Sequence, residues 1–283
     1  MRIDDLDGPR IKRNAAAEAI DILKWLGIDW DEGPVYQTAD LMPYHSALAS
    51  LVARGLAYPC RCTRSQILAA SLSAPHGDEH DLRYPGTCRP ALDSPPPSGL
   101  GDGALSDPNC AWRFRVPDGP IEFTDEFAGP QSHDVQATVG DFLIATKGGL
   151  PSYQLAVVVD DARQGITHIV RGDDLLTSTP RQLLLYRALD LGPLPHYLHL
   201  PLVKGPDGRR LAKRHGDTRI AHYRDCGVKP ERIIGLLAEW CGLGPRREMP
   251  SREFAETFDL QKLPHDAVTF TESGAPLIDA NRR

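Results

Sequence analysis

Apolar residues recur at helical spacing in two segments near the start of the chain. Residues 11 to 26 place their apolar side chains on one face, and Gly27 then supplies a stop signal. Residues 41 to 54 show the same pattern and end before Gly55. We therefore expect an amphipathic helix in each of these two segments.

Three short runs further along the chain predict strands. Residues 156 to 159 and residues 166 to 170 are apolar and of strand length, so we expect both to be buried strands. Residues 112 to 116 alternate apolar side chains with Arg113 and Arg115. That alternation predicts a strand with one buried face and one exposed face.

Two proline signals predict helix starts in the second half. Thr179 and Pro180 together supply a capping hydroxyl and a proline in the first turn, and Pro230 opens a later apolar segment. Alternating strands and helices favour an α/β fold. We expect a catalytic domain of residues 1–56 and 136–220, an inserted lobe of residues 57–135, and a helical C-terminal region of residues 221–283.

Composition excludes several classes of protein. The chain has 283 residues and a net charge of −6, and its apolar runs are far shorter than the roughly 20 residues of a membrane span. Its first seven residues include three acids and no apolar core, unlike a secretory signal. We expect a cytoplasmic protein. Because the chain is acidic, nucleic acid would have to be bound by local basic clusters: Arg209, Arg210, Lys213 and Arg214, then Arg246 and Arg247.

Cysteine spacing predicts a zinc site. Cys60 and Cys62 are separated by one residue, and Cys88 returns after a loop, so three thiolates could face one ion. A fourth ligand could come from His76, His80 or Tyr84, and spacing alone favours a histidine because imidazole is the commoner zinc ligand. The alternative is three reduced cysteines without a metal.

A basic loop follows a turn at Gly205. Its cations could contact a triphosphate, where charge develops during transfer, although an ordinary basic hairpin would look alike. The loop resembles the Lys-Met-Ser-Lys-Ser loop of class I aminoacyl-tRNA synthetases, in the Lys-Leu-Ser-Lys-Arg form of glutamyl enzymes. The resemblance implies that Lys213 is catalytic and that the loop binds ATP, with Mg²⁺. The matching residues are Arg210, Leu211, Ala212, Lys213 and Arg214, of which Ala212 lacks the usual hydroxyl.

Other long segments are similar to the glutamyl-tRNA synthetase family. They are residues 2–7, 25–34, 151–161, 165–174 and 178–186. The resemblance implies a Rossmann-like nucleotide-binding fold with an inserted zinc lobe. It also implies that Tyr84, rather than a histidine, completes the zinc site with Cys60, Cys62 and Cys88.

The same resemblance implies a glutamate site formed by Asp4, Tyr153 and Arg171. A guanidinium can hold a carboxylate through two parallel hydrogen bonds, a geometry that lysine does not reproduce. Asp4 departs from the family, which often has glutamate there.

The C-terminal length distinguishes members of the family. Full-length glutamyl enzymes continue into a long anticodon-binding region, whereas about 70 residues follow Lys213 here. The chain therefore resembles the short paralogues, which activate glutamate with ATP and attach it to queuosine in the anticodon loop of tRNA(Asp). Two alternatives are a fragment of an enzyme that charges the tRNA 3′ end, and an inactive zinc- or RNA-binding module.

One family feature does not occur in the sequence. Class I synthetases open with a strand that leads into a His-Ile-Gly-His-type motif, and this chain begins at the family segment that follows it. We expect that the first strand and helix of the fold are missing because the start is truncated. Without them, we expect little adenylate formation.

Overall fold

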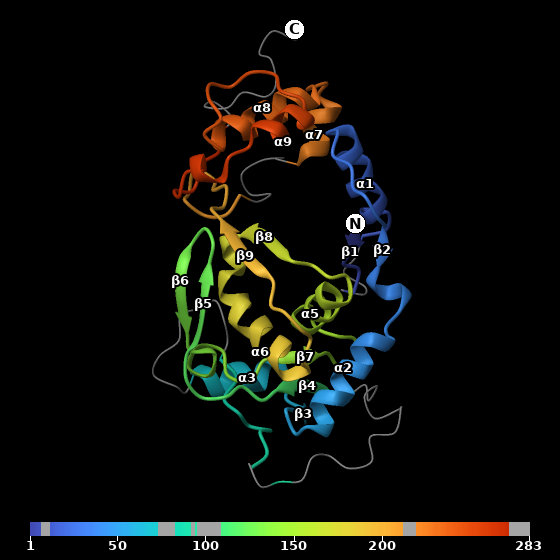
Figure 1. Cartoon of the computed structure of the whole chain (residues 1–283). Coiled ribbons are helices and arrows are strands. Elements are labelled where there is room, and N and C mark those ends of the chain that lie inside the picture. Colours follow the sequence, from blue (N-terminus) through green and yellow to red (C-terminus); the bar gives the residue numbers. More distant parts are fainter. Residues whose placement is uncertain (7–11, 73–82, 92–93, 95–108, 212–218, 272–283) are drawn as a thin grey trace. The chain divides into compact units, whose positions relative to one another are not determined.

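A computed structural model describes residues 1–6, 12–72, 83–91, 94, 109–211 and 219–271 (Figure 1). The chain divides into two compact units, which are described separately. One contains Met1–Ile3, Asp7–Pro34 and Leu200–Arg283, and the other contains Asp4–Leu6 and Val35–His199. The expected insertion of residues 57–135 lies inside the second unit, and its boundaries remain a prediction. None of the helices in the described ranges is long and apolar enough to cross a membrane.

The unit of residues 35–199 contains most of the strands. Its elements are β2 (Val35–Tyr36), η2 (Gln37–Ala39), α2 (Met42–Ala53), β3 (Ala57–Cys60), α3 (Arg64–Leu72), β4 (Ala111–Phe114), β5 (Ile121–Asp125), β6 (Gly129–His133), α4 (Val135–Thr138), β7 (Leu143–Ala145), α5 (Tyr153–Arg163), β8 (His168–Gly172), η4 (Asp173–Ser178), α6 (Thr179–Leu189) and β9 (His196–Leu200).

Small sheets and three helices build the core of this unit. Strands β3, β4 and β7 form an antiparallel sheet, β5 pairs with β6 as a hairpin, and β8 pairs with β9. Helices α2, α5 and α6 pack against one another, and α5 also packs against β7 (Figure 1). Leu51, Ile144, Leu155 and Leu185 are completely buried at these contacts. The expected α/β character is therefore present.

The expected helices at residues 41–54 and at Thr179 are confirmed, but two strand predictions need correction. Residues 156–159 lie in helix α5, whose buried face includes all three valines. An apolar run of this length cannot distinguish a buried helix from a strand by its periodicity alone. Residues 168–172 do form strand β8, but Val170 is 58% exposed, so that strand is not buried.

The other unit is mainly helical. Its elements are β1 (Arg2–Ile3), α1 (Ala15–Trp25), α7 (Ile220–Asp225), α8 (Pro230–Trp240), α9 (Ser251–Thr257) and η6 (Leu260–Lys262). The expected helices of residues 11–26 and of Pro230 are confirmed as α1 and α8. A small core forms around Tyr223, Ile233, Leu236 and Phe270.

Candidate functional site

Three cysteines converge at the end of β3. The sulfur atoms of Cys60, Cys62 and Cys88 all lie within 4.8 Å of one another, and those of Cys62 and Cys88 are 3.5 Å apart. Two thiolates bound to one tetrahedral zinc at 2.3 Å would be separated by about 3.8 Å. The donor set is therefore compatible with a zinc ion, as the spacing predicted.

Tyr84 lies against the same cluster. Its side chain is 2% exposed, and its hydroxyl oxygen is 3.5 Å from the sulfur of Cys60. The hydroxyl also accepts the backbone N–H of Cys88 at 2.8 Å. The structure thus brings together all four expected metal-binding residues, whereas His76 and His80 lie outside the described residues.

A buried cation stabilises this cluster. Arg113 donates from Nε to the sulfur of Cys60 at 3.3 Å, and its guanidinium lies 3.6 Å from the centroid of the Tyr84 ring. The expectation that Arg113 faces solvent is therefore wrong, because the side chain is only 6% exposed. The guanidinium therefore places a positive charge beside the sulfur atoms of the cluster.

The pKa values of two thiols in the cluster differ. Burial raises the pKa of Cys62 to about 11. Burial acts in the same direction on Cys88, but hydrogen bonds, first from the backbone of Arg61 and then from Tyr84, lower the pKa of Cys88 to about 7. The hydrogen bonds at Cys88 therefore favour its thiolate form, which is the form that binds metal.

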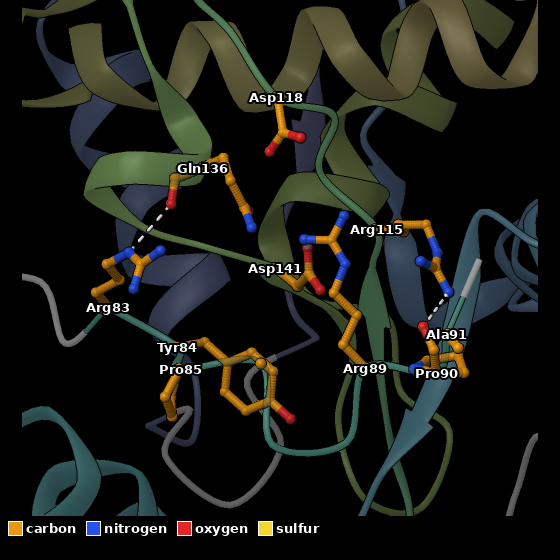
Figure 2. A pocket seen from close by; sticks show the side chains of 11 residues that line it. Arg83, Tyr84, Pro85, Arg89, Pro90, Ala91, Arg115, Asp118, Gln136 and Asp141 are labelled. Atoms are coloured by element: carbon orange, nitrogen blue, oxygen red, sulfur yellow. Dashed lines mark hydrogen bonds and ion pairs between the residues drawn. The ribbon is translucent and has the colours of Figure 1, made fainter.

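A pocket of about 620 Å³ lies beside the Tyr84 loop (Figure 2). Three arginines line the pocket, and each of them forms a hydrogen bond or an ion pair with another segment. Arg83 and Arg115 each donate to a backbone carbonyl of another segment, and Arg89 forms a 3.3 Å ion pair with the buried carboxylate of Asp141. These bonds tie the loop that carries Tyr84 and Cys88 to the rest of the unit.

Arg171, at the end of β8, is held by four acceptors. Its Nε donates to His199 at 2.9 Å, and its Nη2 donates to Thr179 and Gln182 at 2.9 Å and to the carbonyl of Leu175 at 3.5 Å. None of these acceptors is a carboxylate, so the positive charge is not neutralised by direct contact. Within the described parts of the chain, Nη1 is the nitrogen that makes no such bond.

Gln182 is itself held in place. Its Nε2 donates to Oε1 of Gln154 at 3.0 Å, and Gln154 donates to Ser178 at 3.2 Å. The oxygen of the buried Gln182 amide accepts from Arg171 and its nitrogen donates to Gln154, so the orientation of the amide is fixed. The first turn of α5 and the start of α6 together orient the guanidinium of Arg171.

The other two expected glutamate-binding residues are exposed. Tyr153 begins α5 and is 45% exposed, so it is not a core residue. Tyr153 and Arg171 both affect the pKa of Tyr197, which burial raises above its ordinary value. Asp4 is also exposed, in the short segment 4–6 that belongs to the same unit as Arg171.

The basic loop is described only at its start. The amide of Gly205 donates to the carbonyl of Arg209, which confirms the expected turn, and Leu211 packs into the core of its unit. Arg210 is exposed. The expected ATP-binding residues Ala212, Lys213 and Arg214 lie outside the described residues.

Comparison with known proteins decides the family. Residues 1–273 match the model of the class I tRNA synthetases (E and Q), catalytic domain. The chain belongs to this family. The resemblance inferred from the sequence is confirmed, and with it the class I glutamyl-tRNA synthetase catalytic fold.

Similar members of the family fall into two groups. The glutamyl-Q tRNA(Asp) synthetase of Symbiobacterium thermophilum is 45% identical, over 95% of this chain and 84% of the relative. The glutamyl-Q tRNA(Asp) synthetase of Geobacter sulfurreducens is 40% identical, over 96% of this chain and 85% of the relative. The glutamate–tRNA ligase of Syntrophobacter fumaroxidans is 38% identical, over 95% of this chain but 55% of the relative.

Solved structures agree with this assignment. The crystal structure of a glutamate tRNA ligase from Elizabethkingia meningosepticum, in complex with its amino acid, matches with a TM-score of 0.77 and 25% identity. The match covers 97% of this chain and 60% of that chain. Family and relatives together support a synthetase-like ligase that activates glutamate.

Sequence reasoning missed Arg113, Asp125 and His199. Arg113 alternates with apolar residues, a pattern that normally places arginine outside. Asp125 and His199 are far apart in sequence, and a lone acid or histidine gives no signal of its own. Only the fold shows that they touch.

Proposed function

We propose that the chain activates glutamate with ATP and transfers the glutamyl group to queuosine in tRNA(Asp). In the first step the α-carboxylate of glutamate attacks the α-phosphorus of ATP, and pyrophosphate leaves. In the second step a hydroxyl of the queuosine cyclopentenediol attacks the activated carbonyl, and AMP leaves. Mg²⁺ accompanies ATP, as in class I synthetases generally.

The observation that carries this proposal is the pattern of similarity. The glutamyl-Q relatives match with 45% and 40% identity, and the glutamate–tRNA ligase matches with 38% identity. A catalytic fragment of a glutamate–tRNA ligase remains the alternative, and the RNA substrates described below distinguish it.

Arg171 fits the role of anchor for the glutamate side chain. Its charge has no carboxylate partner among its four acceptors, and Nη1 remains for a substrate. The expected two-pronged grip cannot use Nε and Nη2 while the protein binds both of these atoms. We therefore assign the carboxylate contact to Nη1, with Tyr153 and Asp4 proposed as further contacts.

Lys213 is proposed to stabilise the charge that develops on the phosphates during activation. We expect Lys213→Ala to abolish glutamate-dependent pyrophosphate exchange while leaving the Kd for glutamate unchanged. Loss of glutamate binding in this variant would show that the residue acts on the amino acid rather than on ATP.

Zinc is proposed to be bound by Cys60, Cys62, Tyr84 and Cys88. A closed set of four protein ligands is typical of a structural zinc, so its role would be to fix the loop that carries Tyr84 and Cys88. Elemental analysis of the purified chain should give one zinc per chain. Less than about half an equivalent would count against the site.

The transfer step is tested with radiolabelled glutamate, ATP and three RNAs. These are tRNA(Asp) with queuosine, the same tRNA without queuosine, and a queuosine-bearing anticodon stem-loop that lacks the acceptor arm. We expect label on the first and third RNAs only. Label on the RNA without queuosine would instead support charging of the 3′ end. Absence of label and of pyrophosphate exchange, from a chain whose missing first strand and helix have been restored, would support an inactive binding module.

A further inference from the structure

A buried acid–histidine pair lies directly behind Arg171. The Nδ1 atom of His199 is 2.6 Å from Oδ2 of Asp125, and both side chains have no solvent exposure. Asp125 ends β5 and His199 lies in β9, so the pair connects two strands that are separated by more than 70 residues. The proposed chemistry does not use either residue directly.

The hydrogen bonds fix where the imidazole carries its proton. A guanidinium can donate but cannot accept, so the bond from Nε of Arg171 requires a lone pair on Nε2 of His199. The single proton of a neutral imidazole must then be on Nδ1, where it is donated to Asp125. His199 is therefore a neutral ring that accepts from Arg171 and donates to Asp125.

Asp125 is built to remain ionised. Its Oδ1 accepts the backbone N–H groups of Phe127, Ala128 and His199 at 2.7 to 3.1 Å. Burial alone would raise the pKa of Asp125, but these donors and the His199 side chain hold the pKa below its ordinary value. For His199 burial acts in the other direction and lowers the pKa, which agrees with a neutral ring.

We propose that Asp125 and His199 are positioning residues for glutamate recognition, which hold the guanidinium of Arg171 with Nη1 directed toward the substrate. The ionised Asp125 polarises the imidazole, and the imidazole in turn strengthens the bond to Nε of Arg171. The carboxylate of Asp125 contacts His199 and not Arg171. Arg171 is therefore oriented without its positive charge being neutralised. The inference rests on the proposed role of Arg171 as the glutamate anchor.

The charged and titratable groups around the His199 ring are few in the described part of the chain. They are Asp125 on the Nδ1 side, Arg171 on the Nε2 side, and the ring of Tyr197, whose centroid is 6.2 Å away. A second proton on His199 would point an N–H at the N–H of Arg171. We therefore expect glutamate affinity to hold while His199 is neutral and to fall only once the pH drops below the lowered pKa of this histidine.

The decisive variant is Asp125→Asn. The asparagine oxygen can keep the backbone N–H bonds, which leaves its NH₂ group facing Nδ1 of His199. The imidazole must then accept at Nδ1 and carry its proton on Nε2, where it opposes the N–H of Arg171. We expect the Kd for glutamate to rise at least tenfold.

Two further variants separate positioning from stability. His199→Gln can present an oxygen to Nε of Arg171, so we expect a smaller loss and no fall of glutamate affinity at low pH that is due to protonation at this position. Tyr197→Phe is the matched control, because the Tyr197 ring lies beside His199 and Arg171 while its hydroxyl has no hydrogen-bond partner among the described residues. Its Kd should stay within twofold of that of the unmodified chain.

Two readouts test the inference. Calorimetry gives the Kd for glutamate, and ¹⁵N NMR of the imidazole reports directly which nitrogen is protonated. An Nε2–H tautomer in the unmodified chain, or unchanged glutamate binding in folded Asp125→Asn, would overturn the positioning role. An unmodified chain that binds no glutamate would refute the proposed function itself, a result that is distinguishable because the tautomer would still be as described.

Discussion

Replacing Arg113 by methionine should weaken zinc binding without removing any proposed ligand. The substitution deletes the 3.3 Å bond from Nε to the sulfur of Cys60 and the contact with the Tyr84 ring at 3.6 Å. It also deletes the 2.7 Å bond from Nη1 to the carbonyl of Asp141. Methionine retains much of the volume, so the loss is mainly of charge and of hydrogen bonds.

The size of the effect follows from the deleted bond. A hydrogen bond to a charged group contributes about 1.5–3 kcal/mol, which corresponds to roughly 10- to 150-fold in an equilibrium constant. Loss of a partner that supports a metal ligand typically lowers metal affinity by about 10- to 100-fold. We expect a loss within this range for Arg113→Met and a smaller loss for Arg113→Lys, which keeps the charge but not the planar donor.

The assay is competition for zinc with a chromogenic chelator at constant pH. Arg54→Met is the control, because Arg54 donates to the carbonyl of Ala188 and to Asp190 rather than to a sulfur. Its zinc affinity should be within threefold of that of the unmodified chain. Equal affinities in Arg113→Met and the unmodified chain, or equal losses in both variants, would refute the argument.

Three further predictions concern the substrate, the loop and the buried pair. Arg171→Lys should raise the Kd for glutamate at least tenfold by calorimetry, because one ammonium cannot reproduce the bonds to His199 and Gln182 and also bind a carboxylate. Gly140→Ala should lower the free energy of unfolding by about 2 kcal/mol or more in urea titration, since φ is +70° and an added Cβ would lie 2.4 Å from the carbonyl of Tyr84. The free energy of unfolding should also fall as the pH drops below 6.5. In the unfolded chain His199 then gains a proton, whereas its lowered pKa keeps it neutral in the folded chain. His199→Gln should lack this step, and a step of equal size in the variant would contradict its assignment to His199.

The helices were predictable because their signals are local. Gly27 and Gly55 follow α1 and α2 with positive φ angles, and Pro180 and Pro230 lie in the first turns of α6 and α8. Each of these features acts within a few residues, so the sequence carries it directly.

Two of the errors arose where both faces of an element are covered. Helix α5 is buried on most sides, which removes the 3.6-residue period. Strand β4 buries Arg113 because the cysteine cluster lies on its second face. Spacing alone favours a histidine as the fourth ligand, whereas the family resemblance selects Tyr84, which the structure places at the cluster. The pair of Asp125 and His199 depends on contacts between distant segments, and these exist only in the folded chain.

Analysis of the product nucleosides tests the central claim most directly. After reaction with glutamate and ATP, tRNA(Asp) would be digested to nucleosides and examined by mass spectrometry. The account predicts queuosine that is heavier by one glutamyl group, with an unmodified terminal adenosine. Glutamate on the terminal adenosine, with queuosine unchanged, would contradict it.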